Sequence, residues 1–308
     1  MAEVVYLEKF TPKNLAEYLN AFAAHLRAVD RGASSGTYLG AVRAFGRWAD
    51  NRYGAFFPPA VSPLDMVEYR DHLQSSRAGR GSRPLAPATV NKHLIGLRVF
   101  FGWLVATGQV RDNPVGKIRL VATGGPTQPK WLTRNEQAAL VRAVMAGGNL
   151  RDMAIIGLML HAGLRVAEVC AVDRADLDVS ERKGVVRVRK GKGNKYREVP
   201  LNNTVRKILS EWLAANPAGP LFPNRRGHPI SVSGVEKMFA EYVARARPPL
   251  EATPHSLRHT FCRNLLDRGV SLDQVAALAG HSSLDVTKRY TAPSAGDLRA
   301  AVDRIAWE

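Results

Sequence analysis

Strand-like alternation is concentrated in one stretch of this 308-residue chain, GVVRVRKGKGNKYREVPL at residues 184–201. Val185, Arg187 and Arg189 alternate before a Gly-Lys-Gly-Asn turn, and the chain then returns from Tyr196, which predicts an antiparallel hairpin. Apolar residues elsewhere recur mostly at the spacing of helices. The chain is therefore expected to be mainly α with a small antiparallel β-sheet.

The net charge points to a polyanionic partner. The chain has 44 basic and 27 acidic residues, a formal charge of +17. Residues 1–125 hold 16 basic and 9 acidic residues, and the remaining 28 and 18 make the second half basic as well. Phosphates neutralised by lysine and arginine release counterions, so a chain basic in both halves favours nucleic acid over a neutral enzyme with one basic tail.

Helical patterns fill the first half of the chain. Helical faces are predicted for residues 15–26, 38–48 and 67–73, and a longer helix is predicted from Thr89 to Thr107. The outer face of this last helix carries Lys92, His93 and Arg98, which fit an ordinary solvated surface and contact with DNA equally well.

The second half is expected to begin after a linker. Glycine and proline are frequent over 112–130, and we place the linker itself at residues 119–130. Thr133 and Glu136 then form the Thr-x-x-Glu pattern of a helix-capping box. Residues 153–172 are expected to form a buried helical pair broken at HAGLR, and helices with one proline-rich loop at 221–229 follow the hairpin.

Neither a transmembrane helix nor a signal peptide is expected from the sequence. No run approaches the about 18 apolar residues of a membrane-spanning helix, and the start MAEVVYLEKF lacks the pattern of a signal peptide. Cys170 and Cys262 lack CxxC spacing and are expected to be reduced thiols. A cytoplasmic location is predicted.

Three histidines near the C-terminus raise the possibility of a metal site. His255 and His259 are four residues apart on a predicted helix, and His281 follows. Arg258 lies between the first two, a guanidinium cannot bind a cation, and no HExxH glutamate is present. No metal is therefore expected, and His259 is expected to pack into the core beside Phe261.

A different chemistry emerges when the charged residues are taken together. Arg258 and Arg165 suit phosphate oxygens, and Glu168 could hold Arg165 through a helical ion pair. Taken alone, the pair of Arg165 and Glu168 is more typical of a structural ion pair. Lys192 at the hairpin tip could simply be solvated, and Tyr290 could simply pack its ring on the domain. Together, two arginines, a lysine, histidines and a tyrosine hydroxyl form a set suited to metal-free phosphoryl transfer through a tyrosyl ester.

These residues lie in segments that resemble the tyrosine recombinases, also called phage integrases, and especially their Xer-like branch. The matching segments are HAGLRVAEVCAVDRADLD, GVVRVRKGKGNKYREVPL, ATPHSLRHTFCRNLLDRG, LAGHSSLDVTKRYT and, more weakly, LAPATVNKHLIGLRVFFGWLVATGQVRDNPV. They span nearly the whole chain in the order of the family. The resemblance implies site-specific DNA recombination, in which strands are cleaved and rejoined through a 3′-phosphotyrosyl intermediate and a Holliday junction without metal, cofactor or ATP.

The resemblance implies a role for each group that contacts the phosphate. Arg165 and Arg258 correspond to the two arginines that hold the scissile phosphate, and His281 to the histidine that binds it. Glu168 fits the acidic position behind them.

It also implies which groups move protons. Lys192 corresponds to the hairpin lysine that protonates the leaving 5′ oxygen, although Lys190 and Lys195 lie close enough to take this role. His255 corresponds to the proton-transfer histidine and Tyr290 to the nucleophile.

The resemblance implies two domains around DNA. Residues 1–118 would form a helical, SAM-like core-binding domain, with Lys92 and Arg98 as DNA contacts, and residues 131–308 an α+β catalytic domain with a tail helix at 296–308. The two would make a C-shaped clamp on a double-stranded recombination site. A homotetramer on two duplexes is expected, with an accessory DNA-bending protein or partner recombinase possible.

Four alternatives remain at this stage. A type IB topoisomerase-like enzyme or a transposase of a mobile element would use the same chemistry. A DNA-binding regulator would carry a vestigial site. A metal-dependent hydrolase would use the three histidines.

Overall fold

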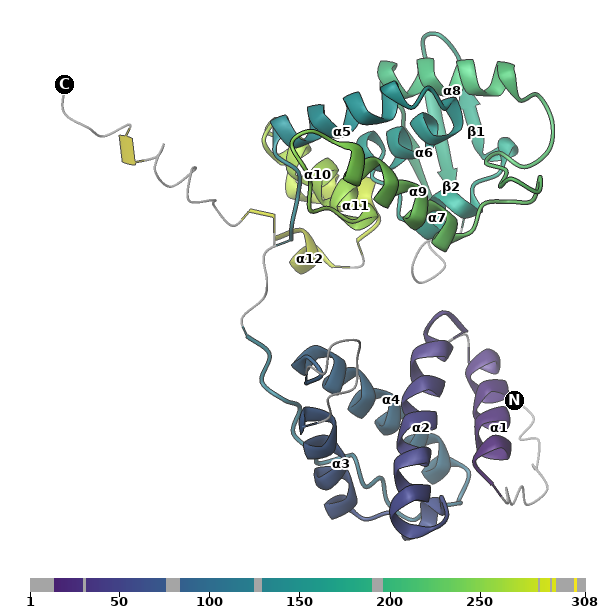
Figure 1. The fold of residues 1–308 in the computed structure, drawn as a ribbon, viewed down its shortest axis with the longest axis vertical. Helices are drawn as coiled ribbons and strands as arrows, with labels where there is room; N and C mark the ends of the chain where they lie inside the picture. The colour runs from purple at the N-terminus through teal and green to yellow at the C-terminus, as the bar shows by residue number, and fades with distance from the viewer. Residues whose placement is uncertain are drawn as a thin grey trace. The chain divides into compact units, whose positions relative to one another are not determined.

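The chain divides into two compact units, Met1–Pro126 and Thr127–Glu308. A computed structural model describes residues 14–29, 32–75, 84–124, 129–189, 196–281, 283–288, 290–291 and 302–303. Each unit has its own large hydrophobic core. Figure 1 shows the helices and strands that make up each unit. The division at 126/127 falls within residues 119–130, and the assignment of functional domains to 1–118 and 131–308 stays a prediction.

The first unit is built from four α-helices. They are α1 (Leu15–Ala28), α2 (Gly32–Tyr53), α3 (Pro63–Ser75) and α4 (Pro87–Ala106). Helix α4 begins two residues before the predicted Thr89 because Pro87 occupies its first turn. A proline is tolerated there, since the N–H that it lacks would have no partner within the helix.

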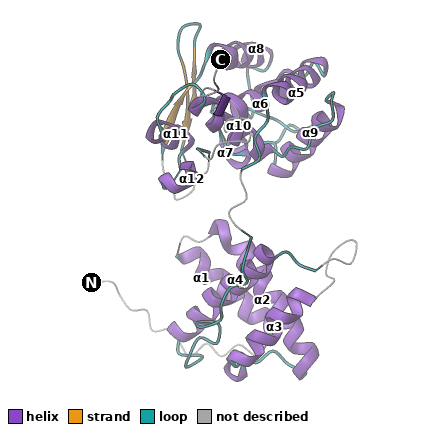
Figure 2. Cartoon of the chain, turned by 90° about the vertical axis from the view of Figure 1, so that its left-hand side faces the viewer, coloured by secondary structure: helices purple, strands orange, loops and turns teal. Residues whose placement is uncertain are grey.

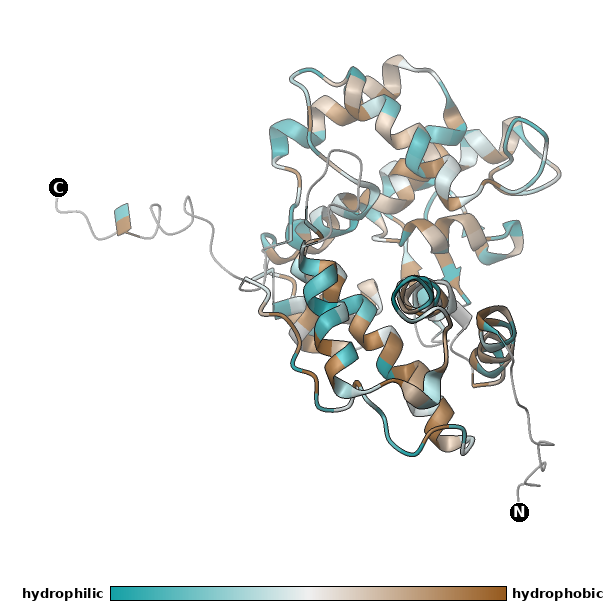
Figure 3. Cartoon of the chain, turned by 60° about the horizontal axis from the view of Figure 1, so that its bottom comes forward, coloured by the Kyte–Doolittle hydropathy of each residue, from teal (hydrophilic) through white to brown (hydrophobic). Residues whose placement is uncertain are grey.

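Aromatic side chains fill the core of the first unit. Phe45 contacts Tyr69 with ring centroids 5.0 Å apart, and Phe100 contacts Phe101 at 5.3 Å, both near-perpendicular. Helices α2 and α4 pack closely because position 96 is glycine: a Cβ there would lie 2.8 Å from that of Ala41. Figure 3 shows hydrophilic and hydrophobic residues alternating around these helices, as the periodicity predicts.

The second unit contains eight α-helices in its described part. They are α5 (Arg134–Ala146), α6 (Leu150–His161), α7 (Val166–Ala171), α8 (Asn203–Ala215), α9 (Val232–Arg245), α10 (Pro254–Leu266), α11 (Leu272–Ala279) and α12 (Leu284–Lys288). The capping box of Thr133 and Glu136 is present at the start of α5. The buried pair broken at HAGLR is confirmed as α6 and α7.

A three-stranded antiparallel sheet accompanies these helices (Figure 2). Strands β2 (Gly184–Val188) and β3 (Arg197–Pro200) are the predicted hairpin, with Val186 opposite Val199. Strand β1 (Leu177–Val179) pairs with β2 and was not predicted, because three residues are too few for a recognisable alternation. Mainly α structure with a small antiparallel sheet is thus confirmed.

A small apolar cluster surrounds the C-terminal helices. Its buried members are Phe261, Cys262, Val275, Ala279 and Tyr290. The cluster joins α10 and α11 to Tyr290, which follows α12 in the chain. Of the predicted tail helix at 296–308, the structure describes only Val302 and Asp303, and the rest lies outside the described residues.

Candidate active site

The loop between α6 and α7 brings Arg165 against α10. Gly163 has a φ of +64°, and a Cβ there would lie 2.3 Å from the ring of Phe261. Only glycine adopts this conformation at no steric cost while leaving room for the ring. Arg165 follows as the N-cap residue of α7, so the HAGLR break places a half-buried guanidinium at a helix start.

Arg258 lies almost wholly inside the second unit, with 1% of its surface exposed. Its Nη1 donates to the carbonyl of Gly163 at 2.6 Å, and its Nη2 donates to the carbonyl of Ala279. Burial and the charge of Arg165 lower the pKa of Arg258 to about 10, which still leaves it charged at neutral pH. The side chain is thus a fixed positive charge that ties α10 to two loops.

Glu168 holds the arginines in place. Its Oε1 accepts from Nη1 of Arg165 at 2.7 Å, and its Oε2 accepts from the backbone N–H of the same residue at 2.8 Å. Nη1 of Arg258 lies 4.0 Å from Oε2. Burial alone would raise the pKa of Glu168, but hydrogen bonds from Arg197 and Arg165 lower it to about 2. The carboxylate is therefore charged throughout the neutral range.

Arg197 completes the group and was missed in the sequence. It starts β3, and its guanidinium binds both oxygens of Glu168 and donates through Nε to the carbonyl of Leu278 at 3.1 Å. The available signal was an arginine leading into the alternating residues of β3. We call Arg165, Arg197 and Arg258 around Glu168 the arginine cluster. Three cations and one anion leave two net positive charges, and a buried surplus of this kind favours a bound anion.

His281 lies at the edge of the arginine cluster. Its Nδ1 is 2.8 Å from Oγ1 of the buried Thr287, and the preceding Gly280 accepts from Nη2 of Arg165 through its carbonyl at 3.1 Å. Burial, Arg258 and Arg165 together lower the pKa of His281 from 6.5 to about 4. The imidazole is thus neutral at pH 7 and can donate or accept one hydrogen bond through each nitrogen according to its tautomer.

Tyr290 is buried beside His281, with 2% of its surface exposed. The two rings are stacked, 6.1 Å apart at their centroids and 9° from parallel. Two hydrogen bonds hold the backbone of Tyr290. Its N–H donates to the carbonyl of Thr287, and its carbonyl accepts from Nη1 of Arg263 at 3.3 Å. The structure therefore brings this tyrosine next to the histidine that borders the arginine cluster.

His255 and His259 lie on one side of α10, and the expectation for His259 was wrong. His259 does not face the core beside Phe261: it is half-buried, and its Nδ1 lies 2.5 Å from the hydroxyl oxygen of Tyr290. Residues two apart on a helix point in nearly opposite directions, so Phe261 and His259 cannot share a face. The ring of His255 is edge-on to that of His259, 4.3 Å away. Desolvation, Arg258 and Arg165 lower the pKa of His255.

Comparison with known proteins decides the family. The model of the phage integrase family matches residues 130–296. XerC tyrosine recombinases also match, at 32% identity in Bacillus subtilis (70% of this chain and 73% of that protein) and at 31% in Syntrophus aciditrophicus (72% and 75%). The chain belongs to the phage integrase family. The arginine cluster, the histidines and the tyrosine described above all belong to the second unit of this tyrosine recombinase.

Solved tyrosine recombinases share the fold. The Tn1549 transposon integrase, in complex with a circular intermediate DNA, aligns with a TM-score of 0.69 at 21% identity, covering 95% of this chain and 99% of that one. XerH bound to palindromic difH substrate aligns with a TM-score of 0.66 at 21% identity, covering 96% and 90%. A mainly helical recombinase fold is thereby shown for this chain.

The other three predicted site residues belong to other segments of the chain. Lys192 and its neighbours Lys190 and Lys195 lie outside the described residues. Lys92 is exposed on α4 of the first unit. Arg98, on the same helix, is half-buried, and its Nη2 donates to the carbonyl of Ile118 at 2.9 Å, which gives it a structural contact beside its predicted role in DNA binding.

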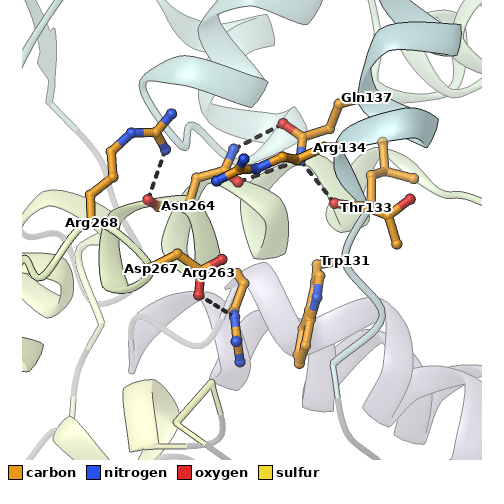
Figure 4. Close-up of a pocket in the computed structure, with 9 residues that line it drawn as sticks. Trp131, Thr133, Arg134, Gln137, Arg263, Asn264, Asp267 and Arg268 are labelled. Atoms are coloured by element: carbon orange, nitrogen blue, oxygen red, sulfur yellow. Dashed lines mark hydrogen bonds and ion pairs between the residues drawn. The ribbon is translucent and has the colours of Figure 1, made fainter. Parts of the chain in front are cut away.

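A pocket of about 410 Å³ lies one turn beyond the histidines on α10 (Figure 4). Trp131 and Arg263 lie side by side there, with the guanidinium carbon 5.1 Å from the ring centre, and Arg263 also pairs with Asp267 at 2.7 Å. Arg263 thus connects the entry of the chain into the second unit with the backbone of Tyr290.

In the described part of the chain, no helix combines the length and the hydrophobicity needed to span a membrane. Nor do three or more histidine, cysteine, aspartate or glutamate side chains gather there in an arrangement that could hold a metal ion.

Proposed function

We propose that this tyrosine recombinase is a site-specific DNA recombinase that cleaves and rejoins strands through a 3′-phosphotyrosyl intermediate and a Holliday junction. The observation that carries the proposal is the joining of Tyr290 to the arginine cluster through His281, whose ring is stacked on the tyrosine. A nucleophile, a cationic phosphate site and a neutral histidine between them are what phosphoryl transfer to a tyrosine requires.

The arginine cluster acts on the phosphate. Arg165 is the arginine of the cluster that retains exposure, with 24% of its side chain accessible, so it can present donors to a phosphodiester. Arg258 is buried and supplies fixed charge behind it. A phosphodiester carries one negative charge and its pentacoordinate transition state carries two, so two net positive charges stabilise the transition state more than the ground state.

The bond changes balance without a cofactor. The hydroxyl of Tyr290 gives its proton to a histidine on α10 as its oxygen forms a bond to phosphorus. The bond from phosphorus to the 5′ oxygen breaks, and Lys192 gives a proton to that oxygen. Rejoining is the reverse, with a 5′ hydroxyl as nucleophile. Because the phosphotyrosyl ester preserves the energy of the broken phosphodiester, neither ATP nor a metal enters the scheme.

The assembly and the place of action are part of the same proposal. We assign a double-stranded recombination site as partner, with Lys92 and Arg98 among the contacts of the first unit. A homotetramer on two duplexes, an accessory protein and a cytoplasmic location complete it. A type IB topoisomerase-like activity is disfavoured because the XerC relatives match over about 70% of the chain, beyond the catalytic segments.

Covalent capture of DNA tests this function. The wild-type chain, incubated with a nicked recombination site in the presence of EDTA, is expected to yield an SDS-stable adduct joined to a 3′ end. Tyr290→Phe should abolish the adduct and leave DNA binding intact, since the phosphate contacts come from other residues. An adduct with the Phe variant, or one that EDTA prevents, would contradict the proposal.

A further inference from the structure

His259 contacts the proposed nucleophile and has no role in the scheme so far. Helix α10 carries His255, His259 and Arg263 at intervals of four residues, so the three side chains follow one stripe of the helix. His259 is the member of this stripe whose Nδ1 lies within 2.5 Å of the Tyr290 hydroxyl oxygen. Arg263 reaches the backbone of the same tyrosine instead.

The hydroxyl of Tyr290 must lose its proton when its oxygen bonds to phosphorus. A free tyrosine has a pKa of about 10, so it is not ionised at neutral pH. With 2% of its surface exposed, Tyr290 has little contact with bulk water that could take the proton. The proton therefore needs an acceptor within the protein.

Nδ1 of His259 has the position and the chemistry for this. A neutral imidazole accepts at one nitrogen and donates at the other, so Nδ1 can accept from Tyr290 when Nε2 carries the hydrogen. Its ring also borders a pocket of about 460 Å³ whose lining includes Lys130, Glu251 and His255. A proton taken from the buried hydroxyl could pass from this ring to His255 or to solvent.

We propose that Nδ1 of His259 takes the proton of Tyr290 during strand cleavage and returns it during rejoining. As the bond between the Tyr290 oxygen and phosphorus forms, the hydroxyl proton moves to Nδ1 and the imidazole becomes an imidazolium. The 5′ oxygen receives a separate proton from Lys192, and nothing is oxidised or reduced. The proposal rests on the proposed function and gives the general base to His259, while His255 lies one step further from the nucleophile.

The groups around the pair set the conditions for this transfer. Those that face it from the packed elements are His255, Arg258, Cys262 and Arg263 on α10, Lys130 and Glu251 on the segments before α5 and α10, and His281 after α11. Lys130 pairs with Glu251 at 2.9 Å and Arg263 with Asp267 at 2.7 Å, so these charges offset each other. A phosphodiester in the arginine cluster adds negative charge beside the pair and favours the transfer when substrate is in place.

Two substitutions separate proton transfer from positioning. His259→Asn keeps a hydrogen-bonding group near the place of Nδ1 but cannot take a proton, and His259→Ala removes both functions. The substrate has sulfur in place of the bridging 5′ oxygen, so that its leaving group needs no proton from Lys192. Both variants are expected to cleave it roughly 10²–10⁴-fold more slowly than the wild type, the usual range for a general base.

A pH profile and chemical rescue complete the test. The wild-type rate on the sulfur substrate should fall as the pH is lowered from about 8 to 5, the range in which histidine titrates, and this fall should be lost in His259→Asn. Added imidazole should restore cleavage by His259→Ala. His228→Asn, on an exposed loop of the second unit, is the matched control and should behave as the wild type.

The outcomes divide cleanly. If His259→Asn retains the wild-type rate or the wild-type pH dependence, His259 only positions the tyrosine and the proposal is wrong. A wild-type rate that does not change with pH overturns it without any variant. If Tyr290→Phe still forms the covalent adduct, the proposed function fails first, a result that the histidine variants cannot produce.

Discussion

Arg197 and Glu168 form two parallel hydrogen bonds, 3.0 Å between Nη1 and Oε1 and 2.8 Å between Nη2 and Oε2. Arg165, at the start of the helix that carries Glu168, binds the same two oxygens through its Nη1 and its backbone N–H. A carboxylate with this many donors cannot rotate. Arg197, which is mostly buried, therefore fixes Glu168, and Glu168 fixes the angle at which Arg165 can meet a phosphate. The bidentate geometry of Arg197 thus supports the site from behind.

Substitution of Arg197 should damage both stability and cleavage. Only 10% of its side chain is exposed, so its removal leaves the charge of Glu168 under-compensated in the interior. Arg197→Ala is expected to lower the free energy of unfolding by about 3–5 kcal/mol, the usual effect of breaking a buried pair. Arg197→Lys keeps the charge but loses the second hydrogen bond. Its free energy of unfolding and its cleavage rate should lie between those of the wild type and those of Arg197→Ala.

Urea unfolding and single-turnover cleavage would measure these effects. Arg187→Lys is the matched control, because Arg187 lies on β2 with 37% of its side chain exposed and pairs with Glu198 at 3.5 Å. If Arg197→Lys were as stable and as active as the wild type, the parallel hydrogen bonds would have no part in holding the site.

Lys192 should act on the leaving group. Lys192→Ala is expected to slow cleavage of an ordinary DNA substrate by roughly 10²–10⁴, the worth of a general acid. A substrate with a bridging 5′ sulfur should recover most of this loss, because its thiolate leaves without a proton. Lys190→Ala and Lys195→Ala serve as controls in the same hairpin. Rescue of one of these instead of Lys192→Ala would move the role to that lysine.

His281 should make the DNA-free protein sensitive to acid. Its pKa of about 4 lies below the 6.5 of an ordinary histidine, so below pH 6.5 the unfolded chain binds a proton that the folded chain refuses. The free energy of unfolding therefore falls as the pH drops from 6.5 toward 4. The contribution of His281 to this fall in the free energy of unfolding should be about 1–2 kcal/mol, once screening by solvent is allowed for.

Because other histidines and Glu168 also titrate in acid, the contribution of His281 is taken as a difference between proteins. Urea unfolding of the wild type and of His281→Gln at pH 6.5 and pH 4.5 measures it, with His228→Gln as the exposed control. The Gln variant should lose less stability on acidification, and inorganic phosphate should reduce the loss in the wild type by offsetting the arginines. Equal losses in the wild type and His281→Gln would show that the protonated ring of His281 is not destabilised in the folded state.

Local patterns predicted most of the fold. The capping box at Thr133, the break at HAGLR and the hairpin all depend on residues close in the chain, and the structure contains each of them. The pair of Arg165 and Glu168 could be predicted for the same reason, since residues three apart on a helix face each other.

Long-range pairing explains what was missed. Arg197 meets Glu168 across 29 residues, and His259 meets Tyr290 across 31. Helical spacing shows that His255 and His259 share a face, but it does not show which face a helix turns toward a tyrosine from another segment. The short β1 escaped notice because its pairing with β2, and not its own composition, makes it a strand.

The C-terminal tail should link neighbouring protomers. Leu298, Val302 and Ile305 recur at intervals of four and three residues over 297–307, and so short a helix is unstable alone and needs a surface to dock on. Val302, one of the two residues described there, is 65% exposed in the single chain. Docking on a neighbour in a closed head-to-tail ring would bury this stripe and couple each Tyr290 to the next protomer.

Deletion of residues 296–308 is therefore expected to preserve binding to a single site but to raise the protein concentration needed for tetrameric synapses on a two-site substrate. Val302→Asp should act like the deletion by placing a charge in the apolar stripe, whereas Asp303→Asn, at the neighbouring exposed residue, should leave assembly unchanged. Sedimentation on one-site and two-site DNA would separate these effects. If the truncated protein assembles tetramers at the wild-type concentration, the tail docks on its own domain, and coupling between protomers must come from another surface.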